Sequence, residues 1–119
     1  MRMWMVPPEI LCRKHLLGEH VEIHMFLAHL NKKKGIQGFL KNNCLEPRSI
    51  FQRHEDLAKE LTNRGYNHNS PIKEEDLKIV SELPLECQYW KINIEENLNN
   101  LLKRCSICRT RYNLRTKYD

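Results

Sequence analysis

The segment RKHLLGEHVEIH, residues 13–24, combines three histidines, two glutamates and two basic residues within little more than three helical turns. Imidazole and carboxylate groups often transfer protons in enzymes, and closely spaced histidines can also bind a metal ion. Apolar residues stand between them, so a helix face exposed only to solvent does not account for the composition. The segment is therefore the first candidate for a functional site.

Placed on a helix at 100° per residue, one narrow polar strip holds His15, Gly18, Glu19, Glu22 and His29. Apolar residues flank this strip, with Leu16, Ile23, Leu27 and Leu30 on one side and Leu17, Val21, Met25 and Ala28 on the other. Such a helix is predicted to be wedged into the protein, with its polar strip facing a cleft. A mid-helix glycine costs about 1 kcal/mol relative to alanine, which indicates that another group approaches the backbone at Gly18.

Other interpretations of these residues stay open. Glu19 and Glu22 could pair with nearby cations on a solvated surface. His20 and His24 lie one turn apart on the opposite face, a spacing that can bind a metal ion, but no third ligand has an obvious position in the sequence. We therefore predict no metal at these histidines.

The chain has five cysteines, an odd number without the spacing of a disulfide framework: Cys12, Cys44, Cys87, Cys105 and Cys108. This pattern favours reduced thiols in a cytoplasmic protein. Cys105 and Cys108 have CxxC spacing, but no second CxxC or CxxH follows, so a packing role is favoured over zinc binding or redox chemistry. The common nucleotide-binding, serine-hydrolase and HExxH motifs are absent, and no cofactor is predicted.

The composition bounds the class of protein. A chain of 119 residues with 40% hydrophobic and 29% charged residues is typical of one soluble globular domain, here spanning residues 1–119. No apolar run approaches the roughly 20 residues that span a bilayer, and the N-terminus lacks the pattern of a secretory signal. Lys and Arg outnumber Asp and Glu by 20 to 15, and this net charge of +5 favours a polyanionic partner.

Helical periodicity runs through residues 7–30, 46–66, 72–83 and 93–105, with Ser49 near one N-terminus and Gly65 just past one C-terminus. Residues 31–39 contain two glycines and three lysines and are predicted to form a loop. No segment alternates like a strand. We predict an all-α, single compact domain of three to four helices with long loops.

Four segments carry a resemblance to a known family: MRMW at residues 1–4, CRKHLLGEHVEIH at 12–24, QRHEDLAKELTNRGYNHNSP at 52–71, and the helical spacing between them. Together they resemble the pyrimidine-dimer DNA glycosylases, also called phage-type endonuclease V. The resemblance covers about the first 72 residues. It implies a small all-α monomeric enzyme of the bacterial cytoplasm or a virus-infected cell, which cuts DNA at cyclobutane pyrimidine dimers without a metal or cofactor.

The resemblance also implies the catalytic residues. The family's nucleophile is the α-amino group of the first residue and its key carboxylate is a glutamate on the first long helix, which correspond to Met1 and Glu22. Arg2 and His15 match positions that hold the DNA around the lesion and organise the site. α-Amino groups titrate at about 7.7–8.0, so a neutral fraction is present at physiological pH and can form a Schiff base.

Two differences separate the chain from the family pattern. Well-known members expose a threonine once the initiator methionine is removed, whereas Arg2 is too bulky for ordinary removal, so Met1 itself is expected to be the first residue. The separation from the first residue to the glutamate is retained. Some members carry arginine where this chain has Val21 and Met25, so contacts to the lesion are expected to differ.

Basic and aromatic residues predict a DNA-binding surface. The loop at residues 31–34 and the C-terminal segment 106–119 are basic, and the latter interleaves tyrosines that can stack on unpaired bases. An unstructured solubilising tail is the alternative for this segment. The DNA-binding candidates are Arg2, Arg13, Lys14, Lys32, Lys33, Lys34, Arg109, Arg111, Tyr112, Arg115, Lys117 and Tyr118.

The predicted function is removal of the 5′ base of a pyrimidine dimer in duplex DNA through an N-terminal Schiff base, followed by strand cleavage by β-elimination. One alternative is the same chemistry on another modified or abasic site. Two further alternatives are a non-catalytic basic helical DNA-binding module and a metal-dependent nuclease that uses His20, His24 and nearby carboxylates.

Overall fold

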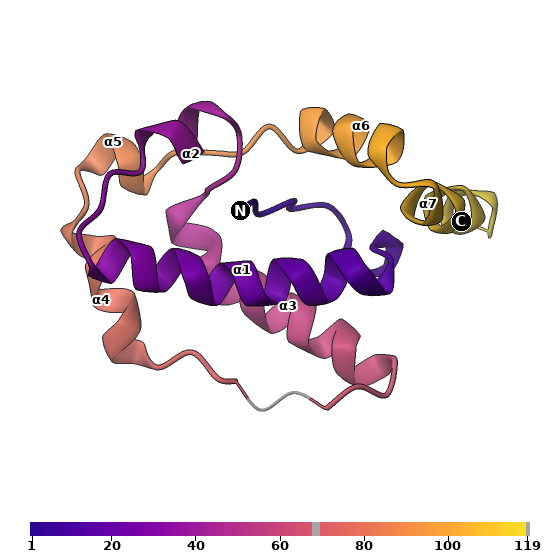
Figure 1. Cartoon of the computed structure of the whole chain (residues 1–119), viewed down its shortest axis with the longest axis horizontal. Coiled ribbons are helices and arrows are strands. Elements are labelled where there is room, and N and C mark those ends of the chain that lie inside the picture. The colour runs from indigo at the N-terminus through magenta and orange to yellow at the C-terminus, as the bar shows by residue number, and fades with distance from the viewer. Residues whose placement is uncertain (68–69, 119) are drawn as a thin grey trace.

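Helix α1 (Arg13–Asn31) crosses the molecule and organises the remaining elements (Figure 1). The structure is a computed structural model that describes residues 1–67 and 70–118, with side chains as far as Arg115. Cys12 caps α1, because its backbone is extended and its sulfur accepts a hydrogen bond from the backbone N–H of His15. The helix therefore begins later than predicted, and the preceding prolines form a short 3₁₀ helix, η1 (Pro8–Ile10).

The core lies mainly between α1 and α3 (Ile50–Asn63), which pack against each other. A second 3₁₀ helix, η2 (Pro47–Ser49), precedes α3, and Gly65 follows its end with a φ of 86°. This positive φ confirms the predicted glycine at the helix C-terminus. The fully buried side chains of the two helices include Leu16, Ile23, Phe26, Ile50 and Leu57.

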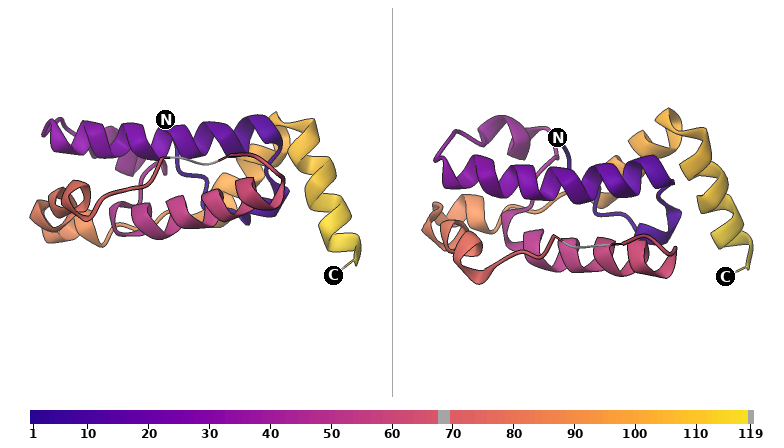
Figure 2. Two further views of the ribbon diagram at one scale, coloured as in Figure 1. Left: turned by 90° about the horizontal axis from the view of Figure 1, so that it is seen from below. Right: turned by 60° about the horizontal axis from the view of Figure 1, so that its bottom comes forward.

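Five further α-helices complete the described fold: α2 (Gln37–Lys41), α4 (Glu74–Glu82), α5 (Leu85–Gln88), α6 (Ile94–Arg104) and α7 (Ser106–Tyr118). Helix α7 lies at the end of the molecule where α1 begins (Figure 2). The described residues include no strand, so the all-α prediction is confirmed. In the described part of the chain, no helix is long and apolar enough to span a membrane.

The prediction of three to four helices is wrong, because the described residues form seven α-helices. Helices α2 and α5 are too short to show helical periodicity in the sequence. Helix α7 has few apolar residues and follows α6 directly. The two helices are separate because the backbone of Cys105 is extended. The predicted loop at residues 31–39 is also shorter, since α2 begins at Gln37.

The predicted burial of α1 is correct on only one flank. Leu16, Ile23, Leu27 and Leu30 are buried, as expected of a flank that packs on the protein. On the other flank, the exposed fractions of Leu17, Val21 and Met25 are 36%, 55% and 48%. The helix is therefore not wedged between two layers, and this second flank forms an exposed apolar stripe.

Candidate active site at the N-terminus

A pocket of about 730 Å³ lies beside α1, and several predicted site residues line it: Met1, Arg2, Lys14, His15, Gly18 and Glu22. Its other wall includes Gly35, Gly38, Phe39, Asn42 and Arg104. The predicted polar strip therefore faces a cleft at the positions of His15, Gly18 and Glu22. Apart from its chain neighbours and the backbone of its own helix, no atom of the described residues would lie within 4 Å of a Cβ on Gly18, so packing against the rest of the protein does not require the glycine.

The carboxylate of Glu22 lies at the start of the chain. Its Oε2 accepts a hydrogen bond of 3.3 Å from the backbone N–H of Arg2, the residue next to the α-amino group of Met1. Glu22 is 20 residues away in the sequence, and the helix presents it to the pocket from the middle of α1. The structure thus brings together the first residue and the glutamate that the sequence paired only by resemblance.

Asn97 on α6 holds the N-terminal segment in place from a fully buried position. Its amide nitrogen donates to the carbonyl groups of Met3 and Trp4, at 3.1 and 3.2 Å. Its Oδ1 accepts a hydrogen bond of 2.6 Å from the guanidinium of Arg2. Asn97 was not among the predicted site residues, because an asparagine within a polar helix gives no sign of burial.

Arg53 on α3 anchors the same segment from another direction. Its Nη1 donates to the carbonyl oxygen of Val6 at 2.6 Å, and its Nε and Nη2 bind the Glu19 carboxylate at 2.6 and 2.8 Å. Burial raises the pKa of Glu19 above its usual value, while the Arg53 guanidinium opposes that shift. Glu19 therefore belongs to a buried ion pair at the wall of the pocket that Glu22 also lines, which excludes the alternative of a solvated surface pair for Glu19.

The His15 ring lies between the pocket and the sulfur atoms of Cys12 and Cys108. The ring lines the pocket and meets the Trp4 ring edge-on, with the two centroids 5.9 Å apart. Its Nδ1 lies 3.1 Å from the sulfur of Cys12 and 3.6 Å from that of Cys108. Burial lowers the pKa of His15 below its usual value, with a further lowering by Lys14 and an opposing effect of Glu22.

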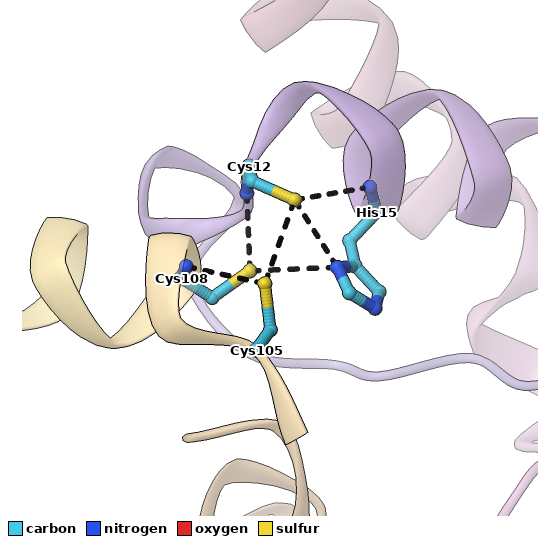
Figure 3. Close-up of side chains that lie close together, drawn as sticks. All are labelled: Cys12, His15, Cys105 and Cys108. Carbon is cyan, nitrogen blue, oxygen red and sulfur yellow. Dashed lines mark hydrogen bonds between the residues drawn. The ribbon is translucent and has the colours of Figure 1, made fainter. Parts of the chain in front are cut away.

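Two clusters in the described residues could hold a metal ion, namely Cys12, His15, Cys105 and Cys108, and separately His20, His24 and His54. The first joins the two chain ends (Figure 3). The second places His54 of α3 against the two histidines of α1. This third candidate ligand for His20 and His24 was not apparent in the sequence, because His54 lies 30 residues after His24.

The predicted DNA-binding residues of α1 and its following loop occupy two places. Lys14 lines the pocket, whereas the Arg13 guanidinium lies 5.4 Å from the centroid of the Tyr66 ring. Lys32, Lys33 and Lys34 are exposed at the far end of α1, next to the pocket residue Gly35. The guanidinium of Arg2 is 5.0 Å from the centroid of the Trp4 ring.

The C-terminal candidates lie on α7, which is a helix over its described residues. Arg111 donates to the backbone carbonyl of Glu9 at 2.8 and 3.0 Å, and Arg115 lies 3.3 Å from the Glu9 carboxylate. Tyr112 packs against the core, and exposed Arg109 donates to the carbonyl of Leu102. The side chains of Lys117 and Tyr118 lie outside the described part of the structure.

These contacts change the interpretation of the C-terminal segment. Arg111 and Arg115 connect α7 to η1, so they contribute to the fold whether or not they contact DNA. Arg104 at the end of α6 lines the pocket and was not among the predicted residues. Its position after a lysine at a helix C-terminus is common for basic residues, and nothing in the sequence marked it as part of a site.

Comparison with known protein families matches residues 1–74 to the pyrimidine dimer DNA glycosylases. Searches among curated proteins and among solved structures found no match. The matched range includes the pocket residues of the N-terminal segment and α1, and it contains the segments on which the resemblance was based. The matched residues make up more than half of the chain, and the chain belongs to the pyrimidine dimer DNA glycosylase family.

Proposed function

We propose that the protein removes the 5′ base of a cyclobutane pyrimidine dimer in duplex DNA and then cuts the strand, with the α-amino group of Met1 as nucleophile and Glu22 as the proton-transferring group. The family supports glycosylase activity on pyrimidine dimers. The observation that carries the assignment of residues is the hydrogen bond of 3.3 Å between the backbone N–H of Arg2 and the Glu22 carboxylate. This contact supports the assignment, because it joins the Glu22 carboxylate to the backbone N–H of the residue that follows the Met1 amine.

The proposed reaction begins when the neutral amine attacks C1′ of the damaged nucleotide. The bond from C1′ to the base breaks, and the base leaves with the bonding electron pair and takes up a proton. Opening of the sugar ring then places a proton on O4′ and forms a C1′=N Schiff base with the enzyme. We assign the delivery of this proton to Glu22, because its carboxylate binds the backbone N–H of the residue that follows Met1.

Strand cleavage follows from the same intermediate. Removal of a proton from C2′ allows the C3′–O bond to break, and the 3′ phosphate leaves with that electron pair. Water then hydrolyses the Schiff base, which restores the amine and releases the unsaturated sugar. We assign the C2′ proton to Glu22 as well, because a carboxylate that has donated its proton to O4′ is ready to accept another.

The amine can reach C1′ only if the damaged nucleotide or the nucleotide opposite it leaves the base stack. The protein must then offer space for the nucleotide that has left the stack. The pocket of about 730 Å³ supports this requirement, and Lys14 and Arg104 supply positive charge on its walls. The exposed Val21 and Met25 lie on the same helix as Glu22. We propose that they contact the lesion through apolar surface, where family members with arginines would bind phosphates.

Borohydride trapping tests the proposal, because reduction converts a Schiff base into a stable covalent bond. Untagged protein would be incubated with duplexes that carry a thymine dimer, an abasic site or no lesion, and peptide mass spectrometry would locate the adduct. We expect an adduct on Met1 with the dimer and abasic duplexes and none with undamaged DNA. An adduct with the abasic duplex alone would retain the lyase reaction and exclude the dimer as the substrate.

Lys14 is the necessary control, since it lines the same pocket and also carries an amine. A Lys14→Arg variant keeps the positive charge but cannot form a Schiff base, so it should be trapped as well as the unaltered protein. Acetylation of the Met1 amine should abolish trapping. An adduct that survives acetylation, or no adduct with either lesion, would overturn the proposed nucleophile.

A further inference from the structure

Three sulfur atoms and one imidazole nitrogen from opposite ends of the chain converge on one point (Figure 3). The four atoms belong to Cys12, His15, Cys105 and Cys108, and all lie within 4.8 Å of one another. Cys12 and Cys108 are buried, and His15 and Cys105 are half-buried. Because the first two residues are about 90 positions or more from the last two, the fold itself creates this cluster.

We propose that Cys12, His15, Cys105 and Cys108 bind a zinc ion that joins the start of α1 to the α6–α7 junction. Thiolate sulfur and imidazole nitrogen are preferred zinc ligands, and three cysteines with one histidine form a common donor set of structural zinc sites. The two pairs have the matching spacings Cys12-x-x-His15 and Cys105-x-x-Cys108. Each pair is thus a short ligand-bearing turn at a helix N-terminus.

Two of the distances within the cluster match the edges of a tetrahedral zinc site. With Zn–S bonds of about 2.3 Å and Zn–N bonds of about 2.0–2.1 Å, the edges of a tetrahedral site are about 3.8 Å between sulfurs and about 3.6 Å from sulfur to nitrogen. The sulfurs of Cys12 and Cys105 are 3.8 Å apart, and the Cys108 sulfur is 3.6 Å from His15 Nδ1. The Cys12 sulfur lies closer to that nitrogen, at 3.1 Å.

Backbone groups surround the sulfurs in the way that thiolate ligands require. The N–H of Cys12 donates to the Cys108 sulfur at 3.1 Å, and the N–H of Cys108 donates to the Cys105 sulfur at 3.4 Å. The N–H of His15 donates to the Cys12 sulfur at 3.5 Å. Such donors stabilise negative charge on sulfur and orient the ligands. Binding would release the protons of the three thiols and leave zinc–sulfur bonds in their place.

The cluster of His20, His24 and His54 is the less suitable of the two. Nε2 of His54 lies 2.9 Å from the carbonyl oxygen of Ser70, so this nitrogen carries a proton that it donates. Its Nδ1 is 3.1 Å from the Glu55 carboxylate. Both ring nitrogens of His54 thus have other hydrogen-bond partners, whereas the backbone N–H groups that donate to the cysteine sulfurs are compatible with thiolate ligands.

A zinc ion at the cysteine cluster would also set the orientation of His15 in the pocket. Coordination through Nδ1 leaves the proton on Nε2, and Figure 3 shows this second nitrogen on the side of the ring away from the sulfurs. Since the His15 ring lines the pocket, the ion would hold a hydrogen-bond donor at its wall. His15 would then act as a positioning residue fixed by the metal.

The first test is the zinc content of the full-length protein, purified with zinc in the medium and under reducing conditions. We expect about one zinc ion per chain, as in other structural sites of this kind. Cys105→Ser and Cys108→Ser should each reduce the zinc content several-fold. Cys87→Ser is the matched control, because Cys87 is buried but lies outside the cluster and the pocket. It should retain the full zinc content.

Replacement of zinc by cobalt identifies the ligands without reference to enzymatic activity. A site with three thiolates should give intense sulfur-to-cobalt charge-transfer absorption and the visible bands of tetrahedral Co²⁺. These bands should be lost in the Cys108→Ser protein and kept in the Cys87→Ser protein. Cobalt bound without charge-transfer absorption, and lost in a His24→Gln variant, would assign the metal to the histidine cluster and overturn the proposal.

A His15→Cys variant separates metal binding from the role of His15 in the pocket. It replaces the imidazole with a fourth thiolate, so zinc content and Tm should be kept even if the substitution alters activity. Removal of zinc with a strong chelator should lower Tm of the unaltered protein by on the order of 10 °C. Full-length protein that contains no zinc, or that shows a disulfide among these cysteines under reducing conditions, would contradict the proposed site.

Discussion

Residues 1–74 and residues 75–118 contribute differently to the pocket. The first part, which matches the family, supplies the proposed reactive groups Met1 and Glu22, and His15 beside them in the pocket. The second part supplies contacts that hold them, since Asn97 binds the N-terminal segment and Cys105 and Cys108 lie against His15. Arg53 in the first part also anchors the N-terminal segment, so the second part adds to this positioning from outside the residues that match the family.

The largest effect on activity is expected when the charge of Glu22, at the proposed reaction centre in the first part, is removed. Glu22→Gln should lower the rate of dimer cleavage by about 10²- to 10⁴-fold, because the amide cannot transfer protons. Single-turnover kinetics on dimer-containing duplex would measure it. Tm should hardly change, since Glu22 faces the pocket. Glu82→Gln, at an exposed position on α4, should retain full activity. Equal rates of dimer cleavage for the two variants would exclude a role of Glu22 in proton transfer.

A residue three positions away on the same helix should affect stability instead. Glu19→Gln leaves the buried Arg53 without a balancing charge, and breaking a buried pair in this way typically costs about 3–5 kcal/mol in the free energy of unfolding. Urea denaturation would measure the loss. Glu60→Gln breaks the more exposed pair with Arg64, the residue that follows α3, and should cost less than about 1 kcal/mol. Similar losses would show that burial does not distinguish the pairs.

In the second part, Asn97→Leu tests the positioning contacts. Loss of the amide leaves the buried carbonyl groups of Met3 and Trp4 without this donor, which should cost about 1–3 kcal/mol in the free energy of unfolding. The rate of Schiff-base trapping should also fall, because the N-terminal segment loses an anchor. Asn99→Leu places the same substitution at an exposed position of α6 and should change neither quantity. Unchanged trapping with Asn97→Leu would show that the segment is held without α6.

The smallest effect is expected at the surface. Replacing Lys32, Lys33 and Lys34 together by alanine should make the salt dependence of DNA binding less steep. The negative slope of log K, where K is the association constant for DNA, against log[salt] should become smaller in magnitude by up to about 0.9 for each phosphate that is no longer neutralised. Fluorescence anisotropy with undamaged duplex would measure the slope. The triple alanine variant of the exposed Lys59, Lys73 and Lys78 makes the same change in net charge on α3 and around α4. Equal slopes would show that only the net charge matters.

Local patterns in the sequence predicted the longer helices and much of the pocket. The periodicity of residues 13–31 was sufficient to place His15, Gly18 and Glu22 on one side of a helix, because helix geometry fixes which residues share a face. The same geometry could not predict which flank would be covered. The exposure of Val21 and Met25, and the burial of Glu19, depend on where α3 packs.

Contacts between distant residues were beyond such patterns. A packing role was predicted for Cys105 and Cys108 because no further ligand follows them in the sequence. The residues that lie next to them in the structure, Cys12 and His15, come from the other end of the chain. The CxxH spacing of CRKH was present as a signal, and comparison with CSIC at residues 105–108 could have found it. Asn97 offered no comparable signal, since its role arises only when the N-terminal segment lies against α6.

The contacts between Arg2 and Asn97, and between Cys12 and Cys108, connect the two ends of the chain. Contacts at such separations form late in folding, because a long loop must close before they are made. Helices α1 and α3 are much closer in sequence and can pair earlier. During synthesis, a nascent chain therefore contains this helix pair before it has a complete pocket. The N-terminal side of the pocket can then be completed only after residues 97–108 have been made and have packed against the first segments of the chain.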